Sequence, residues 1–248
     1  MDHRHDSAGI PWEGRRFHDN PAAGDDGSAP ERLVEAIRRL RADEVGIQDV
    51  VAVLHEERLL VPLVAEAGDE GIGPHGQKVD KTQELSIVTV QGPDGRAVLP
   101  AFSSVEAMRR WDAWARPIPI QASRIALAAA SEGTPLVVVD PGSETQLVVR
   151  RPALAALATG QAWTPSFEDD EVAAAFGDST AGERGVLAIG LAPGDPRALL
   201  AGPELVVVLQ LAEQSPDDRQ ELLTRLQERW AADRLIADRV DSIAVRFA

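Results

Sequence analysis

The sequence predicts an α+β protein built from two units, and three observations support this class. The chain has 248 residues, enough for two modest domains. Apolar runs of helical spacing are interspersed with short β-branched runs up to about residue 165, which predicts a mixed sheet with packed helices. Beyond residue 166 the runs follow the order strand, strand, helix, strand, which predicts a small ββαβ sandwich. We therefore expect a tail at 1–29, an N-terminal domain at 31–165 and a C-terminal domain at 166–248.

The tail is rich in Gly, Pro, Asp, Ser and His and has almost no periodic apolar positions, which predicts disorder over residues 1–29. A helix is expected directly after it. Ser28 stands three residues before Glu31, the spacing of a capping box, and Pro30 would fall in the first turn.

The remainder of the N-terminal unit reads as helices and strands joined by turns. The expected helices after the first one cover 47–57, 123–131 and 153–158. The expected strands cover 59–64, 85–90, 96–102, 136–139 and 146–150. Because proline cannot donate to a strand ladder, Pro62 predicts an edge or a bulge. The turn signal Gly92-Pro93-Asp94-Gly95 predicts a hairpin between 85–90 and 96–102.

The stretch from Arg96 to Ile120 is locally the best specified: a strand, a capped helix and an extended exit. Ser103 precedes Glu106 by three residues, which predicts a capping box. One apolar face of the helix follows at helical spacing: Val105, Met108 and Trp111. Pro117 and Pro119 cannot continue the helix and favour extended backbone. We expect Trp111 to lie inside and Trp114 nearer the rim.

In the C-terminal unit the expected strands cover 186–191, 204–211 and 241–247. A helix should begin at Ser215-Pro216, where a hydroxyl cap, a proline and two acidic residues coincide. The acidic segment 165–184 is expected to be a solvated connection with one short helix around Phe176.

Composition excludes several classes of function. The net charge is −15 and the pI about 4.7, which disfavours binding to nucleic acid or to an anionic membrane. No cysteine is present, so disulfides, thiolate catalysis and cysteine metal sites are excluded. No apolar run long enough for a signal peptide or a membrane span is found, and a cytoplasmic protein is expected.

Motifs for cofactors or metals are weak. Gly71 to Gly76 matches G-x-G-x-x-G, but no helix follows it, and Gln77 stands where a P-loop needs lysine. The histidines of the tail are too sparse for a metal site, and His55-Glu56-Glu57 lacks a second histidine at zincin spacing. We expect no cofactor, no metal and no assignable catalytic residue.

Several strings of the sequence together resemble the SseB family: LLVPLV, DKTQELSIVTV, GPDGRAVLPAFSSVEAMRRWDAWARPIPI, and PLVVVDPGSE with VVRRPALAAL. The run LPAFSS followed by RRW is the most specific of them. The resemblance covers about residues 31–165 as an SseB-like N-terminal domain and, less specifically, residues after 166 as an SseB-like C-terminal domain. The arginine- and alanine-rich composition is similar to that of actinobacterial members. The resemblance implies no established catalytic residues.

Three functions remain open. The first is a protein-binding or regulatory module without catalysis, whose partners and oligomeric state the sequence does not identify. Its candidate interaction surface consists of Phe102, Trp114, Arg116, Pro117 and Pro119, because tryptophan and arginine are typical interface anchors.

The second is an enzyme of unknown reaction, which would need its carboxylates and arginines to converge: Asp112, Arg116, Asp140 and Arg151. A turn-forming Asp-Pro-Gly is the simpler interpretation of Asp140. The third is an oligomeric scaffold that uses the apolar strand at 204–211.

Overall fold

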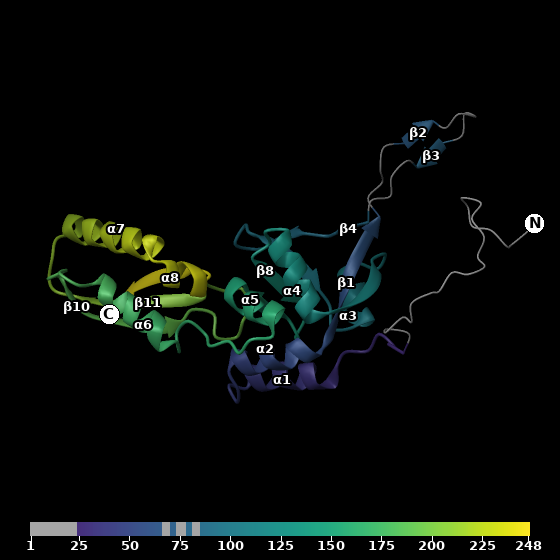
Figure 1. Ribbon diagram of the computed structural model, residues 1–248, viewed down its shortest axis with the longest axis horizontal. Helices are drawn as coiled ribbons and strands as arrows, with labels where there is room; N and C mark the ends of the chain where they lie inside the picture. Colours follow the sequence, from purple (N-terminus) through teal and green to yellow (C-terminus); the bar gives the residue numbers. More distant parts are fainter. Residues whose placement is uncertain (1–23, 66–69, 73–77, 81–84) are drawn as a thin grey trace, which may run out of the picture.

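A computed structural model describes residues 24–65, 70–72, 78–80 and 85–248 of the protein. Most of the expected tail, and the G-x-G-x-x-G match apart from its first two residues, lie outside these ranges. Figure 1 shows two groups of elements side by side along the long axis of the molecule. We call residues 31–165 the N-terminal unit and residues 166–248 the C-terminal unit. The fold is α+β, as the sequence predicts.

The N-terminal unit contains five helices within its described residues: α1 (Glu31–Arg41), α2 (Ile47–Glu56), α3 (Val105–Trp111), α4 (Ala122–Ser131) and α5 (Arg151–Thr159). Its strands are β1 (Arg58–Ala65), β2 (Glu70–Ile72), β3 (Lys78–Asp80), β4 (Leu85–Ile87), β5 (Val90–Gln91), β6 (Ala97–Ala101), β7 (Arg116–Gln121), β8 (Leu136–Val139) and β9 (Leu147–Arg150).

Two main sheets form in this unit. One is mixed, in the order β5-β6-β8-β9, with β6 and β8 parallel. The other is antiparallel, in the order β4-β1-β7. The backbones of Leu60 and Phe102 exchange two hydrogen bonds of 2.7 and 2.8 Å, which link the sheets. Helices α1, α2, α4 and α5 bury their apolar faces against both sheets in one core.

The C-terminal unit has the predicted strand, strand, helix, strand order. Its described elements are α6 (Asp170–Ser179), β10 (Val186–Pro193), β11 (Leu205–Leu211), α7 (Pro216–Ala232), α8 (Arg234–Arg239) and β12 (Ile243–Phe247). The sheet order is β10-β11-β12, and β11 runs parallel to β12. One face of this sheet packs on the three helices in a second core, in which the rings of Phe176 and Trp230 lie 5.3 Å apart.

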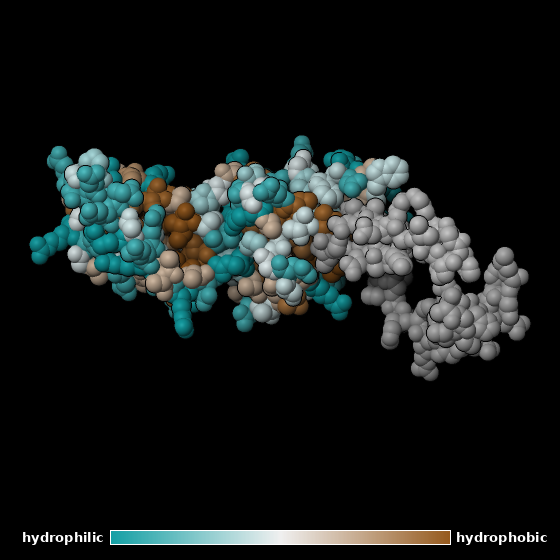
Figure 2. Space-filling model, turned by 90° about the horizontal axis from the view of Figure 1, so that it is seen from above, coloured by the Kyte–Doolittle hydropathy of each residue, from teal (hydrophilic) through white to brown (hydrophobic). Residues whose placement is uncertain are grey.

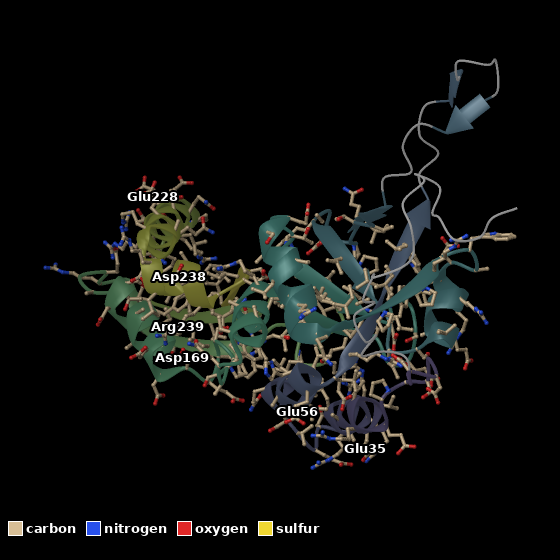
Figure 3. All side chains as sticks on the ribbon, turned by 45° about the vertical axis from the view of Figure 1, so that its right-hand side comes forward. Glu35, Glu56, Asp169, Glu228, Asp238 and Arg239 are labelled. Atoms are coloured by element: carbon tan, nitrogen blue, oxygen red, sulfur yellow. The ribbon has the colours of Figure 1, made fainter. Side chains whose placement is uncertain are left out.

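An ion pair at the surface of this core joins α6 and α8. Asp169 caps the N-terminus of α6 and accepts from Arg239 at the end of α8 at 2.8 Å. Figure 3 shows these two side chains facing each other between the helices. The acidic segment 165–184 therefore contains the predicted short helix, α6, with Phe176 fully buried.

Two predicted caps are wrong by a residue or two. Ser103 does not cap α3: Ser104 does, accepting from Ala107 N at 3.1 Å, while the Ser103 hydroxyl donates to Asp140. The N-cap of α1 is Pro30, without a side-chain bond, and not Ser28. The Ser215 cap of α7 is confirmed, since its hydroxyl accepts from Asp218 N.

The predicted strand 85–90 is two strands in different sheets. β4 pairs with β1, whereas β5 forms the predicted hairpin with β6 across the Gly92–Gly95 turn. Pro62 lies where β1 has a strand partner on one side only: β7 pairs with it there, whereas the pairing of β1 with β4 begins one residue later, at Leu63. Its missing N–H therefore costs no ladder bond.

None of the helices within the described ranges is long and apolar enough to cross a membrane.

Candidate functional site

The turn after α3 holds Trp114 out into solvent. Asp112 N donates to Met108 O, and the Asp112 carboxylate accepts from Trp114 N at 2.8 Å. The next residue, Ala115, is 7 % exposed and packs in a small core beneath the turn. Trp114 itself is 91 % exposed. Its backbone is therefore fixed on both sides, while its indole contacts little of the protein.

The other tryptophan of this stretch is half-buried and its ring points inward against a small core, as expected. The Trp111 ring lies 5.4 Å from the Phe102 ring at 44°. Phe102 is fully buried, because its backbone bonds to Leu60 hold it between the two sheets. The prediction that Phe102 lines an interaction surface is therefore wrong: it is a core residue.

The other candidate surface residues lie at or next to the free edge of a sheet. β7 pairs with β1 along six residues and with no other described strand. Arg116 and Pro117 are exposed, and Pro119 is half-buried. Arg116 forms no ion pair with any residue that the structure describes. Since prolines lack the N–H, this edge offers acceptors at Pro117 and Pro119 but no donors.

The four residues proposed for catalysis are not joined to one another. Asp140 is 1 % exposed and accepts from Ser103 N, from the Ser103 hydroxyl and from the Thr145 hydroxyl at 2.6–2.7 Å. Arg151 donates to three carbonyls at the end of α8: Ala237, Asp238 and Val240. Asp112 serves the Trp114 turn. Within the described ranges, no hydrogen bond or ion pair connects any two of the four.

Asp140 instead fixes a turn. Its φ is +48°, a left-handed conformation that Asp tolerates better than most residues. Its carboxylate links the end of β8 to Ser103, which follows Phe102 in the chain, and to Thr145 in the loop after β8. Both oxygens of this side chain are thus occupied by structural hydrogen bonds to Ser103 and Thr145, which agrees with the turn interpretation.

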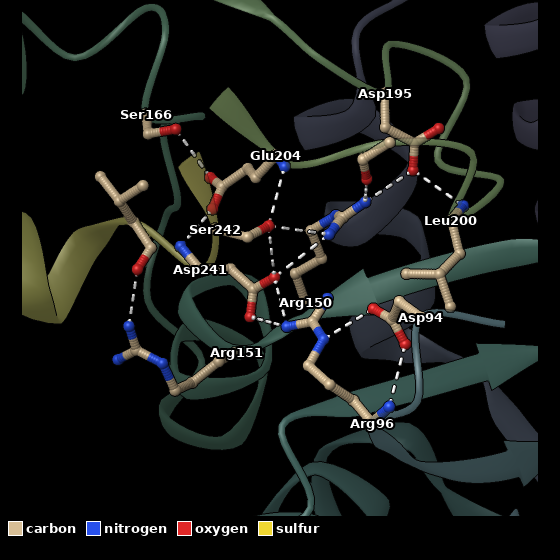
Figure 4. A network of polar contacts seen from close by, with 12 residues as sticks. Asp94, Arg96, Arg150, Arg151, Ser166, Asp195, Leu200, Glu204, Asp241 and Ser242 are labelled. Carbon is tan, nitrogen blue, oxygen red and sulfur yellow. Dashed lines mark hydrogen bonds and ion pairs between the residues drawn. The ribbon is translucent and has the colours of Figure 1, made fainter. Parts of the chain in front are cut away.

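The strongest polar cluster lies where the two units meet (Figure 4), and Arg150 is at its centre. Arg150 ends β9 and is 7 % exposed. Its guanidinium donates to Asp195 at 2.8 Å, to Asp241 at 3.1 Å and to the Gly202 carbonyl at 2.8 Å. Arg96 donates both to Asp241 and to Asp94. Two buried carboxylates of the C-terminal unit are thus neutralised by arginines of the N-terminal unit.

Glu204 extends this cluster. Its carboxylate accepts from Ser166 Oγ at 2.7 Å and from Asp241 N at 2.5 Å. Burial raises the pKa of Glu204, and these two hydrogen bonds lower it in part. A cavity of about 30 Å³ lies beside Arg150, Asp195 and Glu204, room for one or two water molecules but not for a substrate.

The loop 194–203 connects this cluster to the N-terminal unit. Val148 N of β9 donates to the Ala198 carbonyl at 2.8 Å, and Asp195 accepts from Leu199 N and Leu200 N. Arg41 of α1 donates to the carbonyls of Arg197 and Gln146. No polar side-chain atom of the cluster is left without a partner, so we interpret it as a structural junction.

Sequence reasoning missed the junction. It singled out Arg151 instead of its neighbour Arg150, and it treated Asp241 as an ordinary strand start. A signal was present: charged residues stand beside short apolar runs at Arg150, Glu204 and Asp241. Charged residues are rarely buried unless they are paired. The inference that was not made is that these charged residues pair with one another.

The apolar strand offered for self-association is not accessible. β11 is the central strand of its sheet, paired on both sides by β10 and β12, and Leu205, Val207 and Leu209 are fully buried. Within the described residues no group of three or more His, Asp or Glu side chains is placed to hold a metal ion.

Comparison with known proteins gives one result. The family model described as SseB protein N-terminal domain matches residues 33–156, half of the chain. Curated proteins and solved structures gave no significant match. The matched range runs from α1 into α5 and includes both main sheets and the Trp114 turn. The chain belongs to the SseB family.

Proposed function

We propose that this protein is a cytoplasmic, non-catalytic protein-binding module of two domains, residues 31–165 and 166–248. The second domain is proposed to be the SseB-like C-terminal domain, and the protein to be of the actinobacterial type. The single observation that carries the proposal is Trp114, 91 % exposed on a turn whose backbone is fixed by hydrogen bonds. Tryptophan is highly buried on average, so an indole held in solvent by a rigid turn favours an interface anchor.

The surroundings of Trp114 suggest what its partner offers. Arg116 and Pro117 are exposed beside it, and the chain carries Arg109 on the exposed face of the preceding helix. Among the described residues, neither Arg109 nor Arg116 has an acidic partner. We therefore propose a partner surface with an apolar pocket for the indole and carboxylates at its rim.

The mode of binding follows from the edge strand. Both prolines of β7 remove donors from its free edge, so a partner strand would find only half of a ladder there. The partner should therefore recognise side chains and not the backbone of β7. The charge of −15 supports a protein partner over nucleic acid.

The test is affinity purification from the native host with quantitative mass spectrometry. The Trp114→Ala, Arg116→Ala double variant should lose partners that the wild type retains. The matched control is Leu127→Ala with Arg124→Ala, which removes another exposed apolar residue and arginine, both on α4. Identical partner lists for the wild type and the Trp114 variant, with both folded by circular dichroism, would overturn the proposal.

A further inference from the structure

A groove of about 430 Å³ runs along β12 at the edge of the C-terminal sheet. It lies between this strand and the helices α7 and α8, and its apolar lining includes Trp230, Ile236, Val240, Ile243 and Val245. Figure 2 shows hydrophobic residues gathered on this unit beside the hydrophilic surface of α7. Leu205 and Val207 of the central strand are fully buried, whereas Ile243 and Val245 of β12 are only half-buried.

The backbone of β12 presents a regular free edge. Leu205 N donates to Ser242 O, and Ala248 N donates to Leu209 O, so even-numbered positions face β11. Because strand backbones alternate, Ile243, Val245 and Phe247 direct their N–H and C=O groups away from β11. No other described strand pairs with them. Donors and acceptors therefore recur at every second residue, as a further strand requires.

Three other edge strands, β7, β9 and β10, carry features that prevent such pairing. β7 has Pro117 and Pro119. β10 has a bulge between Val186 and Ala188 and ends at Pro193. The edge of β9 is covered by loop 194–203.

β12 has neither proline nor bulge, and its register with β11 is unbroken over five residues. Natural proteins usually protect exposed edges by such means, so an edge without proline or bulge above an apolar groove indicates a place for another strand.

We propose that the β12 edge binds an extended peptide segment of a partner protein, which adds a fourth strand and places alternate apolar side chains in the groove. The site is independent of the Trp114 surface. A second copy of this chain is disfavoured because two molecules of charge −15 repel each other. The groove lining contains no exposed charge, since its one carboxylate, Asp241, is 2 % exposed and bound to arginines.

Two arginines near one end of the groove indicate in which direction the peptide binds. Arg219 lies over the Phe247 ring at 5.4 Å, and Arg246 is exposed on the same strand. Neither arginine has an acidic partner among the described residues. The peptide should therefore carry an acidic residue next to its apolar, alternating part, at the end that meets Phe247.

The experiment selects ten-residue peptides from a random displayed library on the full-length chain. We expect enriched peptides in which apolar residues alternate and an acidic residue lies at one end. Val245→Pro removes an edge N–H that does not serve β11, and should lower their affinity about tenfold or more. Val245→Lys provides a second variant if proline unfolds the domain. Leu187→Lys, on the exposed part of β10, is the matched control and should bind like the wild type.

Backbone recognition is separated from simple apolar contact with N-methylated versions of the enriched peptides, which should bind about tenfold more weakly or worse. Trp114→Ala should leave their affinity unchanged. The proposal is overturned if no peptide is enriched, or if enriched peptides bind the Val245 variants and the N-methylated forms lose nothing. Light scattering that shows a dimer abolished by Val245→Lys would assign the edge to a second copy and would also overturn it.

Discussion

Replacing Arg150 by methionine tests whether the junction is the buried ion cluster that the geometry indicates. The side chains of Arg150, Asp195 and Asp241 are 8 %, 3 % and 2 % exposed. Removing one partner of a buried pair typically costs about 3–5 kcal/mol, because the other charge stays buried without compensation. Here Asp241 keeps Arg96, and Asp195 keeps two backbone donors. We therefore expect the lower end, about 3 kcal/mol.

The assay is urea unfolding at pH 7, followed by circular dichroism, with thermal unfolding alongside. For a chain of this length about 3 kcal/mol corresponds to a fall in Tm of roughly 6–12 °C. The matched control is Arg124→Met on the exposed face of α4, which should stay within about 0.5 kcal/mol of the wild type. A loss below about 1 kcal/mol for Arg150→Met would refute the reasoning, because an exposed pair costs that much.

A double-mutant cycle makes the same test independent of packing. If Arg150 and Asp195 stabilise each other, Asp195→Asn should cost less in the Arg150→Met background than in the wild type. We expect a coupling of about 1 kcal/mol or more between them. Additive losses would mean that the 2.8 Å contact contributes nothing, and that only the volume of the side chains matters.

Three further predictions concern single residues. Arg58 lowers the pKa of Asp25 through a two-bond contact, so the stability contributed by Asp25 should be present above its usual pKa of 3.8 and lost as pH falls through the lower folded pKa. The difference in unfolding free energy between Asp25→Asn and the wild type should therefore shrink below pH 3.8 in a urea titration series. Phe102→Ala should cost about 3–5 kcal/mol and Trp114→Ala less than about 0.5 kcal/mol, and equal losses would contradict their assignment to core and surface. Asp140→Asn should cost about 1.5–3 kcal/mol in thermal unfolding, since an NH2 group in place of Oδ2 cannot accept from the hydroxyls of Ser103 and Thr145.

Local chemistry made much of the fold predictable. The Ser215-Pro216 helix start, the Gly92–Gly95 hairpin and the inward position of Trp111 depend on residues close in the sequence, and all three are found. The errors arose where a distant partner competes for the same group. Ser103 has the spacing of a cap, but its hydroxyl bonds Asp140, 37 residues away, and a charge-assisted hydrogen bond is stronger than an ordinary cap.

The candidate surface and the junction were less accessible to sequence reasoning for a related reason. In the sequence, Phe102 and Trp114 are both large aromatic residues next to a helix. Only the bridge between Leu60 and Phe102, which joins the two sheets, shows that Phe102 is the buried one. The junction depends on pairs separated by 45 and 91 residues, Arg150 with Asp195 and Arg150 with Asp241. No periodicity reports such a pair, because a charged residue beside an apolar run reads as the end of an element.

The composition of the junction bears on how the two proposed binding sites work together. An apolar contact of similar size would hold the units as well or better, since buried ion clusters are weak contributors to stability. Hydrogen bonds are directional, however. The guanidinium of Arg150 can bond Asp195, Asp241 and Gly202 at the same time in only one orientation of the two units. The Trp114 turn lies in one unit and the β12 edge in the other. A junction that fixes the orientation of the units would therefore keep the two sites at a constant separation. A partner that binds both sites would then gain affinity from the second contact, without the entropic cost of fixing the two units relative to each other.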